Sequence, residues 1–408
     1  MRFGLNAFGL ALVAGVTAGV TLAWAAAPGD GVGTSAEVAV PGDAPATVAE
    51  AAATAAPSAA AIPTPSCTPA PLAERAARVL VVGLPGVTDP DDPLIEEVMD
   101  VGVGGILLTK TNVDSEEQVA ALVDALRRRA DRPLVISTDE EPGRVSSFGE
   151  LIGRSSSART MAARDEPEDV RAFAADLGAE LAGFDVDLAL GPVVDLDDGP
   201  AQSVIGDRSF SADADEASAY AIAFTRGLAD AGVMAAPKHF PGHGRSTVDS
   251  HSTASTVEVD LDDLAATDLV PFAEQITEGV PVVMLGHVAY EPLDPDLPAS
   301  LAPSAYALLR DLGFSGVAMT DSLGMGAVHR RWAFPESAVL SVTAGADAAL
   351  TTDGNQSRAM RDALVAAVEA GDLPQARLDE AVARMSHLAG ADPADLVCVD
   401  VEFPELTS

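Results

Sequence analysis

Short apolar runs alternate with longer amphipathic stretches over most of this chain, and this alternation constrains the fold more than any other feature. Most of the runs are continuously apolar, which is typical of parallel strands buried on both faces. The eight runs are Val79–Gly83, Gly105–Thr109, Leu134–Ser137, Val186–Leu190, Val233–Ala236, Val282–Leu285, Gly316–Thr320 and Ala346–Leu350. The helical patterns between them include Glu116–Arg129, Val170–Ala182, Asp213–Ala231, Leu264–Glu278 and Ser304–Leu312. Two of the runs, Val186–Leu190 and Ala346–Leu350, each contain one Asp and are weaker strand predictions.

Eight strands that alternate with helices predict an α/β fold, and we expect a single (β/α)8 TIM barrel over residues 72–390. The competing architecture is a doubly wound open sheet that binds a dinucleotide. Its G-x-G-x-x-G fingerprint is missing, because only Gly83-Leu84-Pro85-Gly86 follows the first run. Residues 391–408 then form a C-terminal tail.

The chain begins with a segment that we exclude from the fold. Residues 1–27 carry Arg2, an uncharged run and three alanines at the end, which is the pattern of a secretory signal peptide. An uncleaved membrane anchor is the alternative, because the run is long. Residues 28–71 are rich in Ala, Pro and Thr and read as a disordered linker. We therefore expect a secreted or extracytoplasmic protein, either free or tethered by an uncleaved N-terminal segment.

The charge balance narrows the range of partners. The chain has 62 Asp and Glu against 24 Lys and Arg, a net charge of −38. A surface this acidic argues against nucleic acid and against docking of the folded domain on anionic lipid. We expect a monomer.

Two cysteines, Cys67 and Cys398, lie on either side of the expected barrel. Cysteine-rich zinc patterns and thiol redox motifs are therefore absent. Two free thiols and one disulfide are equally compatible with the spacing. A closed barrel brings the chain ends together, and export leads to an oxidising compartment, so we favour a Cys67–Cys398 bridge.

Ionisable residues follow five successive predicted strands, where a barrel places its active site. They are Asp139-Glu140-Glu141, Asp195, Lys238-His239, His287 and Asp321. The densest cluster is Lys238–Gly244, followed by Asp249-Ser250-His251. His239 and His243 have the spacing of a helical zinc pair, but Pro241 and Gly242 between them argue against a helix, and Lys238 would repel a cation. We expect neither a metal nor a cofactor.

Three residues have the chemistry of a catalytic group. Asp249 can hydrogen-bond to one ring nitrogen of His251 and leave the other nitrogen for proton transfer, although an exposed salt bridge would give the same pattern. Asp321 ends an apolar strand, where a carboxylate can attack or stabilise a developing cation. The structural alternative for Asp321 is the N-cap of the next helix.

These segments together resemble the bacterial β-N-acetylglucosaminidase (β-N-acetylhexosaminidase) branch of glycoside hydrolase family 3. The resemblance covers roughly residues 75–350, and the motifs occur in the order of the family. They are Asp139–Val145, Ile205–Phe210, Lys238–Gly244, Asp249–His251, His287–Tyr290, Leu293-Asp294 and Thr320–Met325.

The resemblance implies a role for each residue. Asp321 would be the catalytic nucleophile, and His251, polarised by Asp249, the general acid/base. The sugar before the cleaved bond would be held by Asp139, Arg208, Lys238 and His239. The chain departs from the family at Pro142, where Gly is usual, at Ser146-Ser147, where a sugar-binding Arg is usual, and at Ser322, where Asp is frequent.

We therefore expect a retaining exo-β-N-acetylglucosaminidase that releases terminal N-acetylglucosamine from peptidoglycan fragments or chitooligosaccharides by double displacement. The alternatives are a β-glucosidase of the same family, a β-N-acetylglucosaminide phosphorylase, and a catalytically inactive wall-binding protein. Intact Asp321, Asp249 and His251 argue against the last of these.

Overall fold

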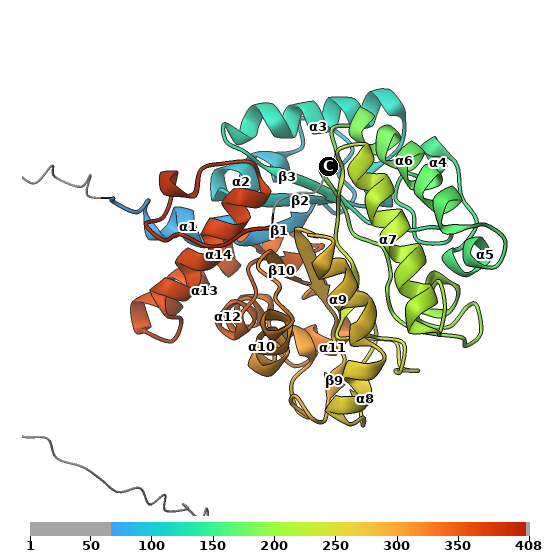
Figure 1. Cartoon of the computed structure of the whole chain (residues 1–408). Helices are drawn as coiled ribbons and strands as arrows, with labels where there is room; N and C mark the ends of the chain where they lie inside the picture. The colour runs from blue at the N-terminus through green and yellow to red at the C-terminus, as the bar shows by residue number, and fades with distance from the viewer. Residues whose placement is uncertain (1–66, 405–408) are drawn as a thin grey trace, which may run out of the picture. The chain divides into compact units, whose positions relative to one another are not determined.

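The computed structural model describes residues 67–404, which form an α/β fold with parallel sheets (Figure 1). The predicted signal peptide and most of the predicted linker lie outside the described residues. The six-stranded sheet has the order β11-β1-β2-β3-β4-β5 and the three-stranded sheet the order β10-β8-β6. Their bounds are β1 Leu80–Gly83, β2 Gly105–Leu108, β3 Val135–Thr138, β4 Leu188–Ala189, β5 Met234–Ala235, β6 Lys238–Phe240, β8 Val282–Leu285, β10 Val317–Thr320 and β11 Ala349–Thr351. A third sheet pairs β7 (Thr256–Val257) with β9 (Ala289–Tyr290).

Helices lie around these strands (Figure 1). The helix α1 Leu72–Arg78 precedes β1. Between the strands from β1 to β5 lie α2 Pro93–Val101, α3 Glu116–Ala130, α4 Gly149–Ile152, α5 Ala158–Ala162, α6 Pro167–Gly183 and α7 Ala214–Asp230. The later helices are α8 Leu261–Ala266, α9 Leu269–Thr277, α10 Pro303–Asp311, α11 Gly326–His329, α12 Phe334–Ala344, α13 Ser357–Ala370 and α14 Gln375–Leu388. Side chains cap several of them at the start; Ser115, for example, accepts a hydrogen bond from the Gln118 N–H of α3. No helix of the described chain is both long and apolar enough to cross a membrane.

Two of the predicted elements are interrupted in the structure. The fifth predicted strand becomes β5, which pairs with β4, and β6, which pairs with β8. Pro237 lies between them and has no N–H to donate to a neighbouring strand. The predicted helix Leu264–Glu278 is also divided, into α8 and α9, at the buried Asp268 just before Pro271. A proline at this position cannot donate the helical bond to Thr267, so a single continuous helix was the wrong prediction.

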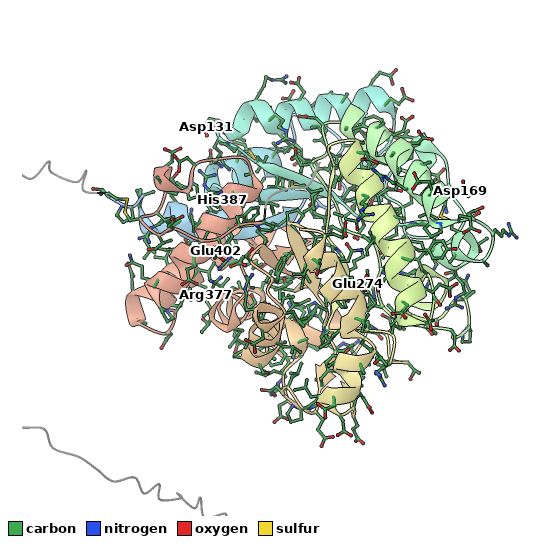
Figure 2. The ribbon with its side chains drawn as sticks, viewed as in Figure 1. Asp131, Asp169, Glu274, Arg377, His387 and Glu402 are labelled. Atoms are coloured by element: carbon green, nitrogen blue, oxygen red, sulfur yellow. A yellow bond between two sulfur atoms is a disulfide. The ribbon has the colours of Figure 1, made fainter. Side chains whose placement is uncertain are left out.

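The two predicted strands that contain an Asp correspond to β4 and β11, each of which begins after its Asp, and both carboxylates have partners. Asp187 pairs with Arg127 and accepts the Ile136 N–H, so the carboxylate is stabilised beside β4. Asp347, fully buried just before β11, is surrounded by three arginines. They are Arg310, Arg377 (labelled in Figure 2) and Arg384. Buried charges are tolerated when they are paired in this way.

The side chains of the strands divide between two hydrophobic clusters. In β1, Leu80 and Val82 pack in the cluster that includes the helices, whereas Val81 packs in a second cluster. That second cluster collects strand residues from both large sheets, such as Leu107, Val135, Val282, Met284, Val317 and Met319. The alternation follows from the two-residue period of a strand, and it places one apolar layer between the sheets and the helices.

The two ends of the described chain are joined to each other. Cys67 and Cys398 form a disulfide with their Cα atoms 5.7 Å apart, and the Ala70 N–H donates to the Leu396 carbonyl at 2.8 Å. These bonds lie beside α1 and α14, which are in contact (Figure 1). The C-terminal segment is therefore fastened to the start of the domain, away from the strand ends that carry the predicted site.

Candidate active site

The segment after β3, the first residue of β6 and the 3-10 turn Gly206–Arg208 bring four charged side chains into one network. Lys238 Nζ donates to Asp139 at 2.7 Å and to Glu141 at 2.7 Å. Arg208 reaches the same Glu141 with two bonds, Nε to Oε2 and Nη2 to Oε1, both 2.8 Å. The Lys238 side chain is 3% exposed and that of Glu141 is 1% exposed. Glu141 is thus the shared anion that holds two cations next to each other.

The electrostatics of this network keep Glu141 and Lys238 charged. Burial alone would raise the pKa of the Glu141 carboxyl, but Arg208 and Lys238 outweigh burial and hold the pKa well below its usual range. Burial alone would lower the pKa of Lys238, but Asp139 and Glu141 outweigh it and raise the pKa. The ammonium and the exposed part of Asp139 can therefore act as a fixed donor and a fixed acceptor for a polar ligand.

His239, the next residue of β6, is held by a buried carboxylate. Its Nδ1–H donates to Asp195 at 2.7 Å, so the other nitrogen, Nε2, points away from this partner. Arg208 Nη2 lies 3.5 Å from that Nε2. Burial raises the pKa of Asp195, but the neighbouring His239 and His243 more than reverse this effect and leave it lowered. The sequence had placed Asp195 at a strand end without assigning this role.

Asp321 follows β10 directly and lies in the same region. Its N–H donates to the Leu285 carbonyl at the end of β8, and its Oδ1 accepts the Ser322 N–H at 2.7 Å. Burial would raise the pKa of this carboxyl, but His287, His239, the Ser322 N–H and Lys238 lower it to about 2. The next helix, α11, begins at Gly326 and has Met325 as its N-cap, so Asp321 is not a helix cap. Asp321 is an ionised carboxylate at any pH near neutral.

His287 supports Ser322, the residue that follows Asp321. It is fully buried; its Nε2–H donates to the Ser322 carbonyl at 2.9 Å, and Ser300 Oγ donates to Nδ1 at 2.7 Å. Burial lowers the pKa of His287, which favours the neutral ring. His287 thus holds the carbonyl of Ser322, the residue whose N–H binds Asp321.

Asp249 and His251 lie on an exposed loop between β6 and β7. His251 Nδ1–H donates to Asp249 Oδ1 at 2.8 Å, and the His251 side chain is 69% exposed. The loop is attached to the interior of the domain by Ser250, whose hydroxyl lies 3.1 Å from Nε2 of the buried His243. Two backbone bonds also join this loop to the start of α11. The imidazole therefore keeps Nε2 free while its other nitrogen is held by a carboxylate.

The structure brings the predicted residues together in two groups. Asp139, Arg208, Lys238 and His239 form one continuous set of contacts, close enough to Asp321 for Lys238 and His239 to lower its pKa. Asp249 and His251 form a separate pair on the loop. Sequence reasoning assigned no role to Glu141 or Asp195, although both stood at predicted strand ends. Within the described residues, no cluster of three or more His, Cys, Asp or Glu side chains is placed to hold a metal ion.

Comparison with known proteins identifies the family of this chain. The family model "Glycosyl hydrolase family 3 N terminal domain" matches residues 72–388. Over 328 residues the chain is 38% identical to "Beta-hexosaminidase LpqI" of Mycobacterium tuberculosis, covering 78% of this chain and 83% of that protein.

Solved structures give the same result. A glycosyl hydrolase of the GH3 family from Mycobacterium smegmatis superposes with a TM-score of 0.72 at 38% identity, over 78% of this chain and 97% of the other. A family 3 β-N-acetylglucosaminidase from Paenibacillus superposes with a TM-score of 0.74 at 33% identity, over 81% of this chain and 64% of the other. The chain belongs to glycoside hydrolase family 3.

Proposed function

We propose that this glycoside hydrolase is a retaining exo-β-N-acetylglucosaminidase. The observation that carries the proposal is an ionised strand-end carboxylate, Asp321, whose strand continues into the turn on which the Asp249–His251 loop docks. Related proteins named beta-hexosaminidase and β-N-acetylglucosaminidase support the choice of substrate.

In the first step, a carboxylate oxygen of Asp321 attacks the anomeric carbon and the glycosidic C–O bond breaks. Oδ1 accepts the Ser322 N–H, which leaves Oδ2 for the attack. The leaving oxygen takes a proton from Nε2 of His251, whose Nδ1 stays bonded to Asp249. The products of this step are the free leaving alcohol and a glycosyl ester on Asp321.

In the second step, water attacks the anomeric carbon and releases Asp321. The neutral His251 Nε2 takes one proton from that water, which restores the imidazolium for the next cycle. Two inversions at the same carbon give overall retention of configuration.

The buried network holds the sugar before the cleaved bond in this proposal. Asp139 accepts from sugar hydroxyls, while Lys238 donates the proton that its two carboxylate partners leave free. His239 offers Nε2, because Asp195 holds Nδ1. Arg208 both holds Glu141 and remains able to donate to the sugar. Glu141 occupies Nε and one proton of Nη2, and the Val204 carbonyl occupies only one proton of Nη1.

A cavity beside the His251 loop supports peptidoglycan fragments as the substrate. Its volume is about 290 Å³, and its lining includes residues 253–256 of the loop, His287, Arg330 and Arg331. Arg331 is held by the Asp296 carbonyl at 2.8 Å and by the ring of Trp332 at 4.5 Å. Neither Arg330 nor Arg331 has a carboxylate within ion-pair distance, whereas most arginines of the described chain do. Two available guanidinium groups suit a leaving sugar that carries a carboxylate.

Two broader proposals accompany this one. The two large sheets would form one closed barrel, supported by isolated parallel bridges between Val193 and Lys238 and between Met319 and Ala348, which connect their edges.

Export of the domain is supported by the leader-like first 27 residues and by the Cys67–Cys398 bond, since disulfides persist in oxidising compartments.

One assay tests the function directly. Purified protein is given an aryl β-N-acetylglucosaminide with and without phosphate, and the anomer first released is identified by NMR. We expect free β-N-acetylglucosamine in both cases; sugar 1-phosphate would instead identify a phosphorylase, and faster cleavage of an aryl glucoside a β-glucosidase.

The source of the substrate has its own test. Wild type, Arg330→Ala, Arg331→Ala and the control Arg164→Ala, an exposed arginine without an ion pair, are compared on leaving groups with and without a carboxylate. We expect both cavity variants to lose preference for the carboxylate and the control to keep it. Equal preference in all four proteins would remove the support for peptidoglycan.

A further inference from the structure

Two backbone hydrogen bonds connect the loop of His251 to the turn that follows Asp321. The Gly326 N–H donates to the His251 carbonyl at 2.9 Å, and the Ala327 N–H donates to the Ser250 carbonyl at 3.0 Å. Gly326 lies five positions after Asp321 in the chain. The two groups proposed to act on opposite ends of the glycosidic bond are therefore linked through a short, continuous stretch of backbone.

That stretch is itself held by the neighbouring strands. Asp321 N–H is bonded to the Leu285 carbonyl of β8, Leu323 N–H to the Leu350 carbonyl of β11 at 2.9 Å, and Met325 N–H to the Ser322 carbonyl at 2.9 Å. The Ser322 carbonyl also accepts from the buried His287. The turn is thus a fixed platform, in contrast to the exposed loop that docks on it.

The close approach depends on the absence of a side chain at position 326. A Cβ atom built on Gly326 would lie 2.7 Å from the carbonyl oxygens of both His251 and Ser252, and 2.9 Å from the Ser252 carbonyl carbon. Contacts this short do not occur in folded proteins, and all three atoms belong to the backbone. Any larger residue must therefore push the loop away from the turn.

We propose that Gly326 is a positioning residue for catalysis, which holds the proton-transferring loop at a set place relative to the nucleophile. The inference rests on the proposed function, because it assigns proton transfer to His251. Gly326 touches neither substrate nor reacting atoms. It acts by setting the position of the His251 loop relative to the segment that carries Asp321. A displacement of about 1 Å in such a register is enough to cost a large part of the rate.

The variant Gly326→Ala tests this directly. The measured quantity is kcat/KM, which reports the first chemical step, for a series of aryl and alkyl β-N-acetylglucosaminides with leaving groups of increasing pKa. We expect a loss of about tenfold or more for the poorest leaving groups and little loss for the most activated phenol, since only poor leaving groups need the proton. Azide should partly restore kcat, because an anion replaces water without needing a base.

Gly324→Ala is the matched control in the same turn. The nearest atoms to a Cβ at Gly324 are on the ring of Phe334 at 3.3 Å, a side chain that can shift. We expect this variant to keep the wild-type dependence on leaving group. A second comparison places Gly326→Ala in a His251→Ala background, where it should cause no further loss in kcat/KM if it acts through His251.

The possible failures can be told apart. If His251→Ala lowers kcat/KM by the same factor for every leaving group, the proposed function is wrong. If His251→Ala shows that dependence but Gly326→Ala lowers kcat/KM equally for all substrates, or adds its loss to that of His251→Ala, the positioning role is refuted. If Gly326→Ala has no cooperative unfolding transition, Ala327→Pro takes its place in the same comparisons. This variant removes the N–H that donates to the Ser250 carbonyl, and proline is tolerated in the first turn of a helix such as α11.

Discussion

Replacement of Glu141 by Gln is the sharpest test of how the buried charges hold the sugar subsite together. Glu141 is the carboxylate that Arg208 and Lys238 share, and all three side chains are at most 10% exposed. Gln is nearly the same size, so packing is kept while the charge is removed. Lys238 would still have Asp139, but Arg208 would keep no carboxylate within ion-pair distance.

The expected cost is large because a buried cation would lose its counterion. Breaking a buried ion pair from one side costs about 3–5 kcal/mol. The unfolding entropy is about 2 cal/mol/K per residue, or about 0.7 kcal/mol/K for a domain of about 330 residues. The melting temperature should therefore fall by about 4–7 °C, and KM should rise as Lys238 and Arg208 lose their fixed positions.

The assay is thermal and urea unfolding of wild type, Glu141→Gln and the control Glu150→Gln. Glu150 forms an exposed pair with Arg154, with side chains 79% and 65% exposed, so its loss should cost less than about 1 kcal/mol. A Glu141→Gln protein that melts within a degree of the control would show that the network does not stabilise the domain.

The pH dependence of the stability gives an independent check that Glu141 stabilises the domain as an ionised carboxylate. The pKa of Glu141 lies below its usual value in the folded protein, so its stabilising contribution is complete above the unfolded pKa of about 4.5 and is lost as the pH falls toward the folded pKa. The difference in stability between wild type and Glu141→Gln should therefore be largest near neutral pH and shrink below about pH 4.5. A difference that grows on acidification would contradict the charge assignment.

Three further perturbations test the remaining assignments. Asp321→Ala should reduce kcat at least ~10³-fold with an unchanged melting temperature, because the nucleophile is lost; substantial residual turnover with the same anomer as product would exclude that role. His251→Ala should spare kcat/KM for activated aryl leaving groups, with azide rescue of kcat, and Asp249→Asn should show a milder form of this pattern; equal loss for every leaving group would count against both. Cys67→Ser with Cys398→Ser should lower the melting temperature by opening a loop with a sequence separation of 331, for which loop entropy sets an upper limit of ~6 kcal/mol, while kcat at 25 °C stays the same. An altered kcat would show that the bridge affects the site.

Much of the architecture could be predicted from the sequence, because it depends on local periodicity. The run Val282–Leu285 is β8 with the same bounds, and the pattern Asp213–Ala231 differs by one residue at each end from α7. The breaks were also local in origin, since Pro237 and Pro271 each lack the N–H that a continuous element needs there. Reading those prolines as interruptions would have divided both elements correctly.

The position of the candidate site could also be predicted from the sequence, because polar residues that follow buried parallel strands meet at one edge of the sheet. What the sequence could not show is which of those residues serve the ligand and which serve each other. Glu141 and Asp139 stand two positions apart, yet one is almost completely buried between two cations and the other is partly open. That difference arises from Arg208 and Lys238, which are 67 and 97 positions away along the chain from Glu141.

The docking of the His251 loop was decided by tertiary structure alone. Gly326 directly follows the motif Thr320–Met325, but no local pattern shows what it contacts, and its importance follows from backbone atoms of residues 251 and 252 that lie against it. Contacts between distant segments depend on how the strands pair and where each loop returns, which no local pattern encodes. The sequence thus determined the chemistry available at the strand ends, and the packing of the chain determined how those groups are held and oriented.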